Sequence, residues 1–288
     1  MPDNEQNFDT ILIALDGSRP SQVAASLALQ IAKQEKLLVR GLYIVDELLV
    51  VESEYKLEKE LGYKPGEVLV SDERVQLLKS QGEAALRWLE ERGQNNEVPV
   101  QGDLMFGGMP DVIMQEAEKV RLLALGRQGR GNDDDGTHLG GHFRIIAHQT
   151  PVPLLIGGET LSPIRRILLA YDGSLPAKRA LTWASLLQHI WQSHLLVVSV
   201  ADETPSPHWL AEMEEQIDDS GLQNYRFIGR QGDATTQILA TASEEKADLI
   251  VMGGHQHSAL LEWLTGSTLD QVLRNTPLPV FVTDKQGD

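Results

Sequence analysis

Short apolar runs alternate with longer amphipathic stretches along the chain, and the same alternation occurs twice. The run at 11–15 precedes a helical pattern over 21–34, and the run at 167–171 precedes a helical pattern over 176–191. Apolar, β-branched strands separated by helices are typical of parallel sheets, because each parallel connection must be long enough to hold a helix. The pattern predicts the order β-α-β-α-β-α-β-α-β in each half of the chain.

The two halves also share sequence motifs in the same order. The segment ILIALDGSRP at 11–20 returns as ILLAYDGSLP at 167–176, so Asp172 stands 156 positions after Asp16 in a chain of 288 residues. The ends of the halves correspond as well, since HQTPVPLLI is mirrored by RNTPLPVFV. We therefore predict two homologous domains, residues 1–158 (half one) and 163–288 (half two), each a doubly wound α/β domain with a parallel five-stranded sheet.

Half one carries an insertion that half two lacks. From the first-strand aspartate to the glycine that ends the fourth strand, half one spans 110 positions (16 to 126) and half two spans 81 (172 to 253). Much of the surplus is the segment 47–71, which opens with the apolar residues 48–51. Such a segment is too apolar for a solvated linker. We expect it to fold onto its own domain, and a lid or partner surface is the alternative.

Composition excludes several classes of partner and chemistry. The formal net charge is −17, from 42 acidic and 25 basic residues, which disfavours nucleic acid and anionic membranes as partners. The chain has no cysteine, so disulfides, thiolate zinc sites and cysteine nucleophiles are absent. No run approaches 18 apolar residues, and the first ten residues are acidic without an apolar core. The expected location is the cytoplasm.

The most informative polar residues follow the first strand of each half. Asp16 and Asp172 each precede Gly and Ser, at the carboxyl end of a strand where doubly wound sheets bind ligands. An aspartate or serine there can cap the next helix, or the carboxylate can face a ligand. The sequence leaves both roles open.

These motifs together resemble the universal stress protein family over nearly the whole chain. The resemblance rests on DGS after the first strand, on DLIVMG at 248–253, and on the ending GST to TPLPV. It implies a Rossmann-like fold of the adenine nucleotide alpha hydrolase type. It also implies a tandem protein whose domains pack through their last strands about a pseudo-twofold axis, as an intramolecular counterpart of the family's dimers.

The resemblance further implies a nucleotide site. Family members that bind ATP hold it with glycine, two residues, glycine, nine residues, then glycine with serine or threonine, and others lack this motif. The strand-end aspartate then contacts the adenosine moiety, and backbone groups at Ile44 or Val200 read the adenine edge.

Half two keeps most of this motif. Gly253 stands first and Gly266 lies at the correct distance, but Gln256 replaces the second glycine. Ser267 could donate to a phosphate, or it could cap the helix expected at 267–274. The candidate ATP-binding residues of half two are Asp172, Val200, Gly253, Gln256, Gly266, Ser267 and Thr268.

Half one departs further from the motif. Nine residues after the second glycine the chain reaches Leu139, so the closing glycines come one step late and no hydroxyl follows them. Three consecutive aspartates, 133–135, lie in the loop that should surround phosphates and would repel them. The weaker candidate residues of half one are Asp16, Ile44, Gly126, Gly129, Gly140 and Gly141.

Paired histidines do not define a metal site. His255 and His257 flank Gln256, and His138 and His142 have helical spacing, but no third ligand is fixed by either spacing. We predict no bound metal other than Mg²⁺ carried with ATP.

The sequence thus predicts a stress-response protein that binds ATP chiefly in half two and acts through an unknown protein partner, with further homodimerisation open. The alternative is an adaptor or small-molecule carrier whose ATP motifs have decayed. A third hypothesis, an enzyme that transfers adenylate or phosphate, lacks a catalytic constellation. Since there is no G-x-S-x-G elbow and no Walker lysine, we expect no enzymatic activity beyond slow ATP hydrolysis.

Overall fold

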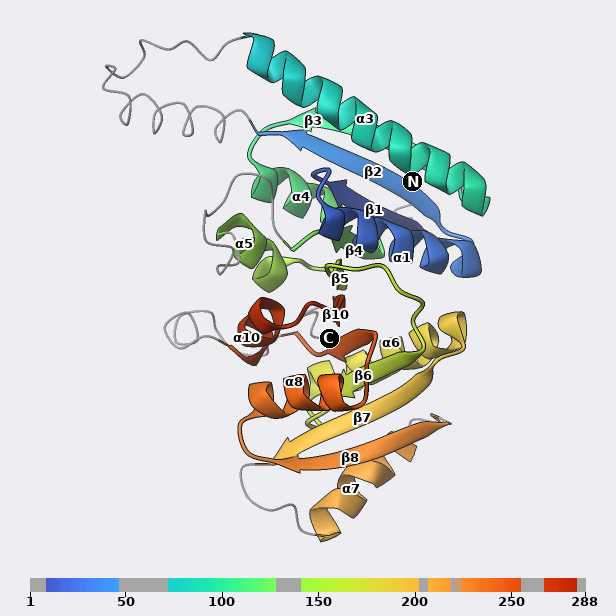
Figure 1. The fold of residues 1–288 in the computed structure, drawn as a ribbon, viewed down its shortest axis with the longest axis vertical. Coiled ribbons are helices and arrows are strands. Elements are labelled where there is room, and N and C mark those ends of the chain that lie inside the picture. The colour runs from blue at the N-terminus through green and yellow to red at the C-terminus, as the bar shows by residue number, and fades with distance from the viewer. Residues whose placement is uncertain are drawn as a thin grey trace, which may run out of the picture.

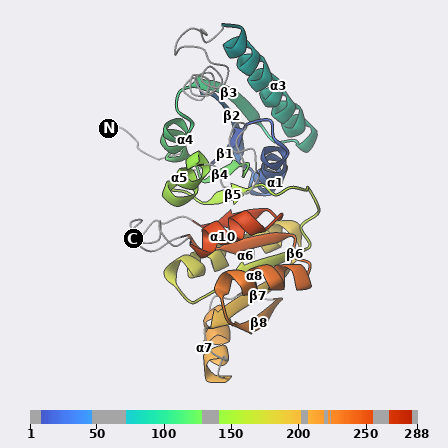
Figure 2. The same cartoon turned by 60° about the vertical axis from the view of Figure 1, so that its left-hand side comes forward.

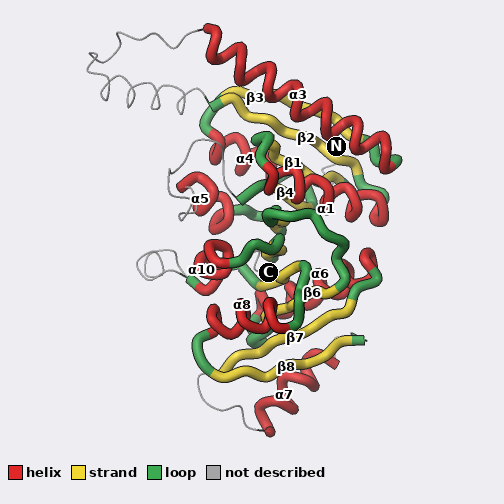
Figure 3. Tube along the Cα trace, viewed as in Figure 1, coloured by secondary structure: helices red, strands yellow, loops and turns green. Residues whose placement is uncertain are grey.

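A computed structural model describes residues 9–46, 72–127, 141–201, 207–218, 222, 224–254 and 267–283. The insertion predicted at 47–71 lies outside the described residues. Strands and helices alternate along each half (Figures 1 and 3). The described elements of half one are β1 (Thr10–Leu15), α1 (Arg19–Glu35), β2 (Leu38–Val45), α3 (Asp72–Asn96), β3 (Val100–Phe106), α4 (Met109–Ala117), β4 (Leu122–Leu125), α5 (Gly141–Gln149) and β5 (Leu154–Ile156).

Half two repeats the same order of elements. They are β6 (Arg166–Ala170), α6 (Leu175–Trp191), β7 (His194–Ala201), α7 (Pro207–Asp218), β8 (Tyr225–Gln231), α8 (Ala234–Glu244), β9 (Leu249–Met252), α10 (Thr268–Asn275) and β10 (Val280–Val282). The predicted alternation of strands and helices is therefore confirmed. None of the helices in the described ranges has the length and apolar content that a membrane span needs.

The ten strands that the structure describes form one sheet, in the order β3-β2-β1-β4-β5-β10-β9-β6-β7-β8. Read outward from the centre, each half has the same strand order, which confirms that the chain is a duplicated doubly wound fold. Among the described strands, every pairing within a half is parallel, and only β5 with β10 is antiparallel. The halves thus meet edge to edge through their last strands, as Figure 1 shows at the middle of the molecule.

A pseudo-twofold axis passes through the junction of the two halves. At the middle of the antiparallel pair Leu155 faces Phe281, and each stands five residues after the threonine of a Thr-Pro pair. Equivalent residues of the two halves therefore contact each other, as on the axis of an isologous dimer. Both are fully buried, and the ring of Trp183 on α6 packs at 5.0 Å from the ring of Phe281.

Two apolar cores cover the two faces of the sheet, and both extend through the junction. One core contains side chains of α1, α3, α6 and α7, and the other contains side chains of α4, α5, α8 and α10. Figures 1 and 2 show these two helical layers from different sides. Strands buried on both faces explain why the sequence shows continuous apolar runs instead of alternation.

The turns after β1 and β6 explain the repeated DGS motif. Gly17 and Gly173 have φ of 76° and 78°, a region that glycine enters at little cost. The next residues, Ser18 and Ser174, are the N-caps of α1 and α6 and accept hydrogen bonds from the backbone of the first turn. The motif therefore reverses the chain and begins the helix.

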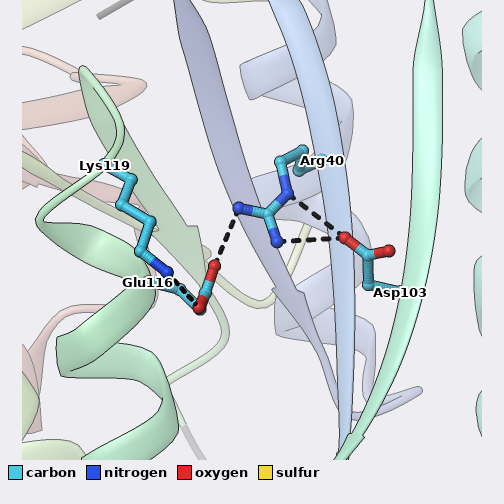
Figure 4. A network of polar contacts seen from close by, with 4 residues as sticks. All are labelled: Arg40, Asp103, Glu116 and Lys119. Atoms are coloured by element: carbon cyan, nitrogen blue, oxygen red, sulfur yellow. Dashed lines mark hydrogen bonds and ion pairs between the residues drawn. The ribbon is translucent and has the colours of Figure 1, made fainter. Parts of the chain in front are cut away.

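An ion-pair network fixes α4 to the sheet in half one (Figure 4). Arg40 on β2 donates to Asp103 on β3 and, at 2.8 Å, to Glu116 on α4, which also accepts from Lys119 at 2.7 Å. Glu116 is 5% exposed. Burial alone would raise the pKa of its carboxyl, but the bonds from Lys119 and Arg40 outweigh burial and lower that pKa. The charge of Glu116 therefore stabilises the fold above the pKa of an unfolded glutamate.

Replacing Glu116 tests this network. Glu116→Gln keeps the shape but removes the charge, and we expect the free energy of unfolding at neutral pH to fall by about 1–3 kcal/mol in urea titrations. Because the folded pKa is depressed, the difference from the wild type should be complete above about pH 4.3 and should vanish as the pH falls through the folded value.

The exposed pair of Lys33 with Glu97, at 3.2 Å, provides the control. Glu97→Gln should change the free energy of unfolding by less than about 0.5 kcal/mol. Equal effects of the two substitutions would contradict a stabilising role for the Glu116 network.

Candidate functional site

A pocket of about 340 Å³ lies at the carboxyl ends of β6, β7 and β9 in half two. The chain runs outward from β6 to β7 on one side, while β9 pairs with β6 on the other. This is the point where the strand order reverses, and doubly wound sheets bind their ligands there. The pocket is lined by Ala170, Tyr171, Asp172, Ser174, Pro176, Ala177, Val198, Val200, Ala234, Ile238, Met252, Gly253, Gly254, Ser267, Thr268 and Leu269.

One part of the pocket is formed by helix N-termini. Ser174 at the start of α6, Ala234 at the start of α8, and Thr268 at the start of α10 all line it. The first turns of helices have backbone N–H groups without intrahelical partners and a partial positive charge. The start of α8 is capped by the carboxylate of Asp233, whereas the serine-capped starts of α6 and α10 beside the same cavity favour an anionic ligand.

The other part of the pocket is apolar. Val198 and Val200 come from β7, Ile238 from α8, and Met252 from the end of β9. An apolar wall opposite a few polar groups is the usual composition of a site for a flat organic ring. The pocket thus combines a surface for an aromatic group with an anion-binding edge.

The serine at the start of α10 has a structural role in addition to its place in the pocket. Ser267 is the N-cap of α10, and its Oγ accepts from the backbone N of Asp270 at 3.1 Å. A hydroxyl that accepts this bond can still donate its proton to a phosphate oxygen. The capping role and the ligand role are therefore compatible at Ser267.

The aspartate after β6 is arranged in the same way. Oδ1 of Asp172 accepts from the backbone N of Ser174 at 2.9 Å, and the residue is exposed at the rim of the pocket. In half one Asp16 makes the corresponding bond to Ser18 at 2.8 Å. The bond orients the carboxylate, and in half two it leaves Oδ2 without a hydrogen bond from the described residues.

Five of the seven residues predicted for half two line the pocket together: Asp172, Val200, Gly253, Ser267 and Thr268. Gln256 and Gly266 lie outside the described residues. In half one Asp16 and Gly126 end β1 and β4, Ile44 is half-buried in β2, and Gly141 begins α5. Gly129, Gly140, the acidic loop and three of the four paired histidines lie outside the described residues. Whether any of these residues binds a ligand stays a prediction.

Comparison with known proteins identifies the family. The universal stress protein family profile matches this chain twice, over residues 7–156 and 163–284. The chain belongs to the universal stress protein family. It is a tandem member, because the two matches coincide with the two halves of the sheet.

Relatives of this universal stress protein match either the whole chain or one part. A universal stress protein of Archaeoglobus fulgidus has a TM-score of 0.75 at 23% identity, with 97% of both chains covered. A putative universal stress protein of Pseudomonas aeruginosa has a TM-score of 0.68 at 18% identity, covering 96% of this chain and 94% of that one. These likenesses establish the fold.

Curated relatives match shorter regions. Universal stress protein Slr1230 of Synechocystis is 28% identical over 165 residues, which are 56% of this chain and 56% of that protein. A universal stress protein of Thermus aquaticus is 33% identical over 135 residues, which are 41% of this chain and 97% of that protein. The chain therefore spans about half the length of the first of these relatives.

The glycines that end β4 and β9 have a packing role in this family member. A Cβ on Gly253 would lie 2.8 Å from the carbonyl carbon of Pro176 and 3.0 Å from the backbone N of Ala177. A Cβ on Gly126 would lie 2.8 Å from the backbone N of Ser21. The sequence interpretation assigned these glycines to phosphate contact, but close packing of a helix N-terminus on the strand end is sufficient to require them.

Half one also has a buried polar contact at residues that the sequence interpretation does not single out. Asp46, which follows β2, accepts from the backbone N of Met109 at 3.0 Å and is largely buried. Met109 begins α4 as Ala234 begins α8, and in half two a carboxylate also lies at the helix start, since Asp233 accepts from the backbone N of Thr236 at 2.8 Å. The residue of half two that corresponds to Asp46, Asp202, lies outside the described residues. The sequence signal that could have indicated this helix start is the glycine-led turn that precedes it in each half.

A difference between the halves follows the glycine at the end of the fourth strand. In half two this next residue is Gly254, which lines the pocket, whereas in half one it is Arg127. Arg127 is 8% exposed and donates to the backbone oxygens of Thr276 and Leu278 across the junction. Burial lowers the pKa of its guanidinium, although the charge of Glu159 opposes this effect. Arg127 therefore binds half two to half one.

Another polar contact joins the halves beside the pocket. Asp270 in the first turn of α10 accepts from Arg144 at 3.1 Å and from His148 at 2.9 Å, both on α5 of half one. Asp270 is 2% exposed.

Within the described ranges no group of three or more side chains is arranged to hold a metal ion.

The packing role of the strand-end glycines can be tested in both halves. Gly126→Ala and Gly253→Ala should each lower the free energy of unfolding by about 1–3 kcal/mol, because a backbone segment must move to admit the methyl group. Gly102→Ala is the control, since the atoms nearest to its Cβ would be side-chain atoms of Glu90 and Leu86. If Gly102→Ala were as destabilising as the other two in urea titrations, close backbone packing would not explain why both halves have glycine at the end of the fourth strand.

Proposed function

We propose that this universal stress protein binds one adenine nucleotide, ATP with Mg²⁺, in the pocket of half two. The observation that carries the proposal is the convergence of the serine-capped starts of α6 and α10 beside an apolar wall, at the point where the strand order reverses. The base would lie against Val198, Val200 and Ile238, and the phosphates would face the start of α10. The carboxylate of Asp172 would accept hydrogen bonds from hydroxyl groups of the nucleoside. It would not face the phosphates.

A difference between the two halves supports a single nucleotide site per chain. In half one Arg127 stands where Gly254 lines the pocket of half two, and it is directed at backbone oxygens across the junction. We infer that half one binds nucleotide more weakly or not at all, and that occupancy of half two changes the surface offered to a protein partner in a stress response. Turnover beyond slow ATP hydrolysis is not part of the proposal.

A non-nucleotide adaptor or small-molecule carrier is the second candidate function. It is favoured by the packing role of Gly253 and the capping role of Ser267, which the fold requires even without a ligand. Mass spectrometry of small molecules released from the purified, denatured protein separates the two functions. An adenine nucleotide released in about equal amount to the protein supports the first, and another bound compound supports the carrier.

Calorimetry with Mg-ATP tests the site. We expect one site per chain, and Ser267→Ala should weaken binding by about tenfold because a hydrogen bond to a charged phosphate is lost. Asp172→Asn keeps the acceptor for Ser174 N but removes the charge, and we expect a loss of similar size. Asp16→Asn, the equivalent change in half one, should leave the affinity unchanged. Two equivalent sites, or equal effects of Asp16→Asn and Asp172→Asn, would contradict the proposal.

A further inference from the structure

The ion pair between Arg144 and Asp270 joins equivalent positions of the two halves. Each residue stands six positions before the threonine of a Thr-Pro pair, and each lies in the corresponding helix, α5 or α10. Their charged groups meet at 3.1 Å near the pseudo-twofold axis. In a dimer of identical domains the same position would bring two like charges together. The opposite charges therefore belong to the tandem arrangement, in which the two halves have different sequences.

Asp270 lies in the part of α10 that faces the pocket. Ser267, Thr268 and Leu269 line the pocket, and the backbone N of Asp270 donates to Ser267 Oγ. An aspartate in the first turn of a helix offsets the partial positive charge of that end. A bare carboxylate at this position would also repel an anionic ligand directly. Such a residue is unfavourable beside a phosphate site unless its charge is compensated.

Half one supplies the compensating charge. The carboxylate of Asp270 accepts from Arg144 and from His148, both on α5. Burial alone would raise the pKa of Asp270, but His148 and Arg144 outweigh burial and hold that pKa below its usual value. The carboxylate is therefore ionised near neutral pH, and its charge is balanced by Arg144.

The position of Arg144 supports this role. It lies in the first turn of α5, where a cation is unfavourable for its own helix because that end is already partly positive. The first turn of α5 has no acidic residue to offset this charge. Within the part of the chain that the structure describes, the acidic partner of Arg144 is Asp270, across the junction.

We propose that half one acts as a charge-compensating support for the anion-binding edge of half two, with Arg144 as the positioning residue that works through Asp270. Arg144 keeps the start of α10 electrostatically open to the phosphate groups of a ligand, and it does so without lining the pocket. This inference rests on the proposed function, since it needs a phosphate-bearing ligand at α10. It assigns to half one a part in ligand binding that does not depend on a nucleotide site of its own.

The experiment compares Mg-ATP with adenosine as probes of the full-length protein in calorimetry. In the Arg144→Gln variant the carboxylate of Asp270 no longer has an arginine that balances its charge. We therefore expect the affinity for Mg-ATP to fall by about tenfold at low salt. Adenosine carries no phosphate, so its affinity should stay within about twofold of the wild type. The loss for Mg-ATP should diminish as the salt concentration rises.

A second substitution separates charge from structure. Adding Asp270→Asn to Arg144→Gln removes the uncompensated charge, and we expect the Mg-ATP affinity to return to within about twofold of the wild type. If the pair merely held α10 in place, the double variant would remain weak. Asp270→Asn alone should bind Mg-ATP at least as tightly as the wild type.

Arg121→Gln is the matched control. Arg121 is also an arginine of half one at the junction, where it pairs with Glu35 at 3.7 Å and lies over the ring of Trp183 on α6. It directly precedes β4 and is not one of the residues that line the pocket. Its replacement removes the same charge without touching α10, and it should leave Mg-ATP affinity unchanged.

Three outcomes would overturn the inference while the proposed function stands. These are an unchanged Mg-ATP affinity in Arg144→Gln, an equal loss for adenosine, and a double variant that stays weak. An Arg121→Gln variant as weak as Arg144→Gln would overturn it too, because the effect would then be one of net charge. A wild-type protein that binds neither probe would refute the proposed function and, with it, this inference.

Discussion

The antiparallel pairing of β5 with β10 is the contact on which the rest of the structure depends. It converts two five-stranded sheets into one sheet of ten strands and buries Leu155 and Phe281 against each other at the axis. Because the pairing removes the last-strand edge of both halves, neither half exposes that row of backbone donors and acceptors. The apolar cores on both faces then continue from one half into the other, so that each half is part of the environment in which the other is stable.

Duplication of the domain produced symmetry in the backbone but not in the side chains near the axis. Half one contributes cations, with Arg127 directed at backbone oxygens and Arg144 directed at Asp270, whereas half two contributes the acceptors. The same divergence affects the ends of β4 and β9, since Arg127 crosses the junction in half one, whereas Gly254 at the corresponding position of half two lines a pocket. A homodimer would have to use one sequence for both sides. The tandem chain is free of that constraint, and the pocket and its support can therefore lie in different halves.

Several residues near the pocket serve the fold and the candidate site by the same geometry. Ser267 caps α10, Asp172 orients the turn before α6, and Gly253 admits the start of α6 close to β9. Each role places a backbone N–H group, a hydroxyl or a carboxylate at the carboxyl ends of the strands, where it can contact a ligand. Retention of such a motif is therefore weak support for ligand binding by itself. The combined arrangement of polar helix starts and apolar wall is the stronger support, because capping alone does not require it.

The sequence by itself determined the duplication, the order of strands and helices, and the position of the strand-end residues, because these depend on local periodicity and on repeated motifs such as DGS. It also placed Asp172 and Ser267 beside one pocket, since the ends of parallel strands converge. Only the tertiary structure decided that Asp46 bonds to Met109, that Arg127 crosses the junction, and that Arg144 meets Asp270. Each of these contacts joins residues far apart in the chain. Their pairing is set by sheet register and by the pseudo-twofold axis, which no local pattern encodes.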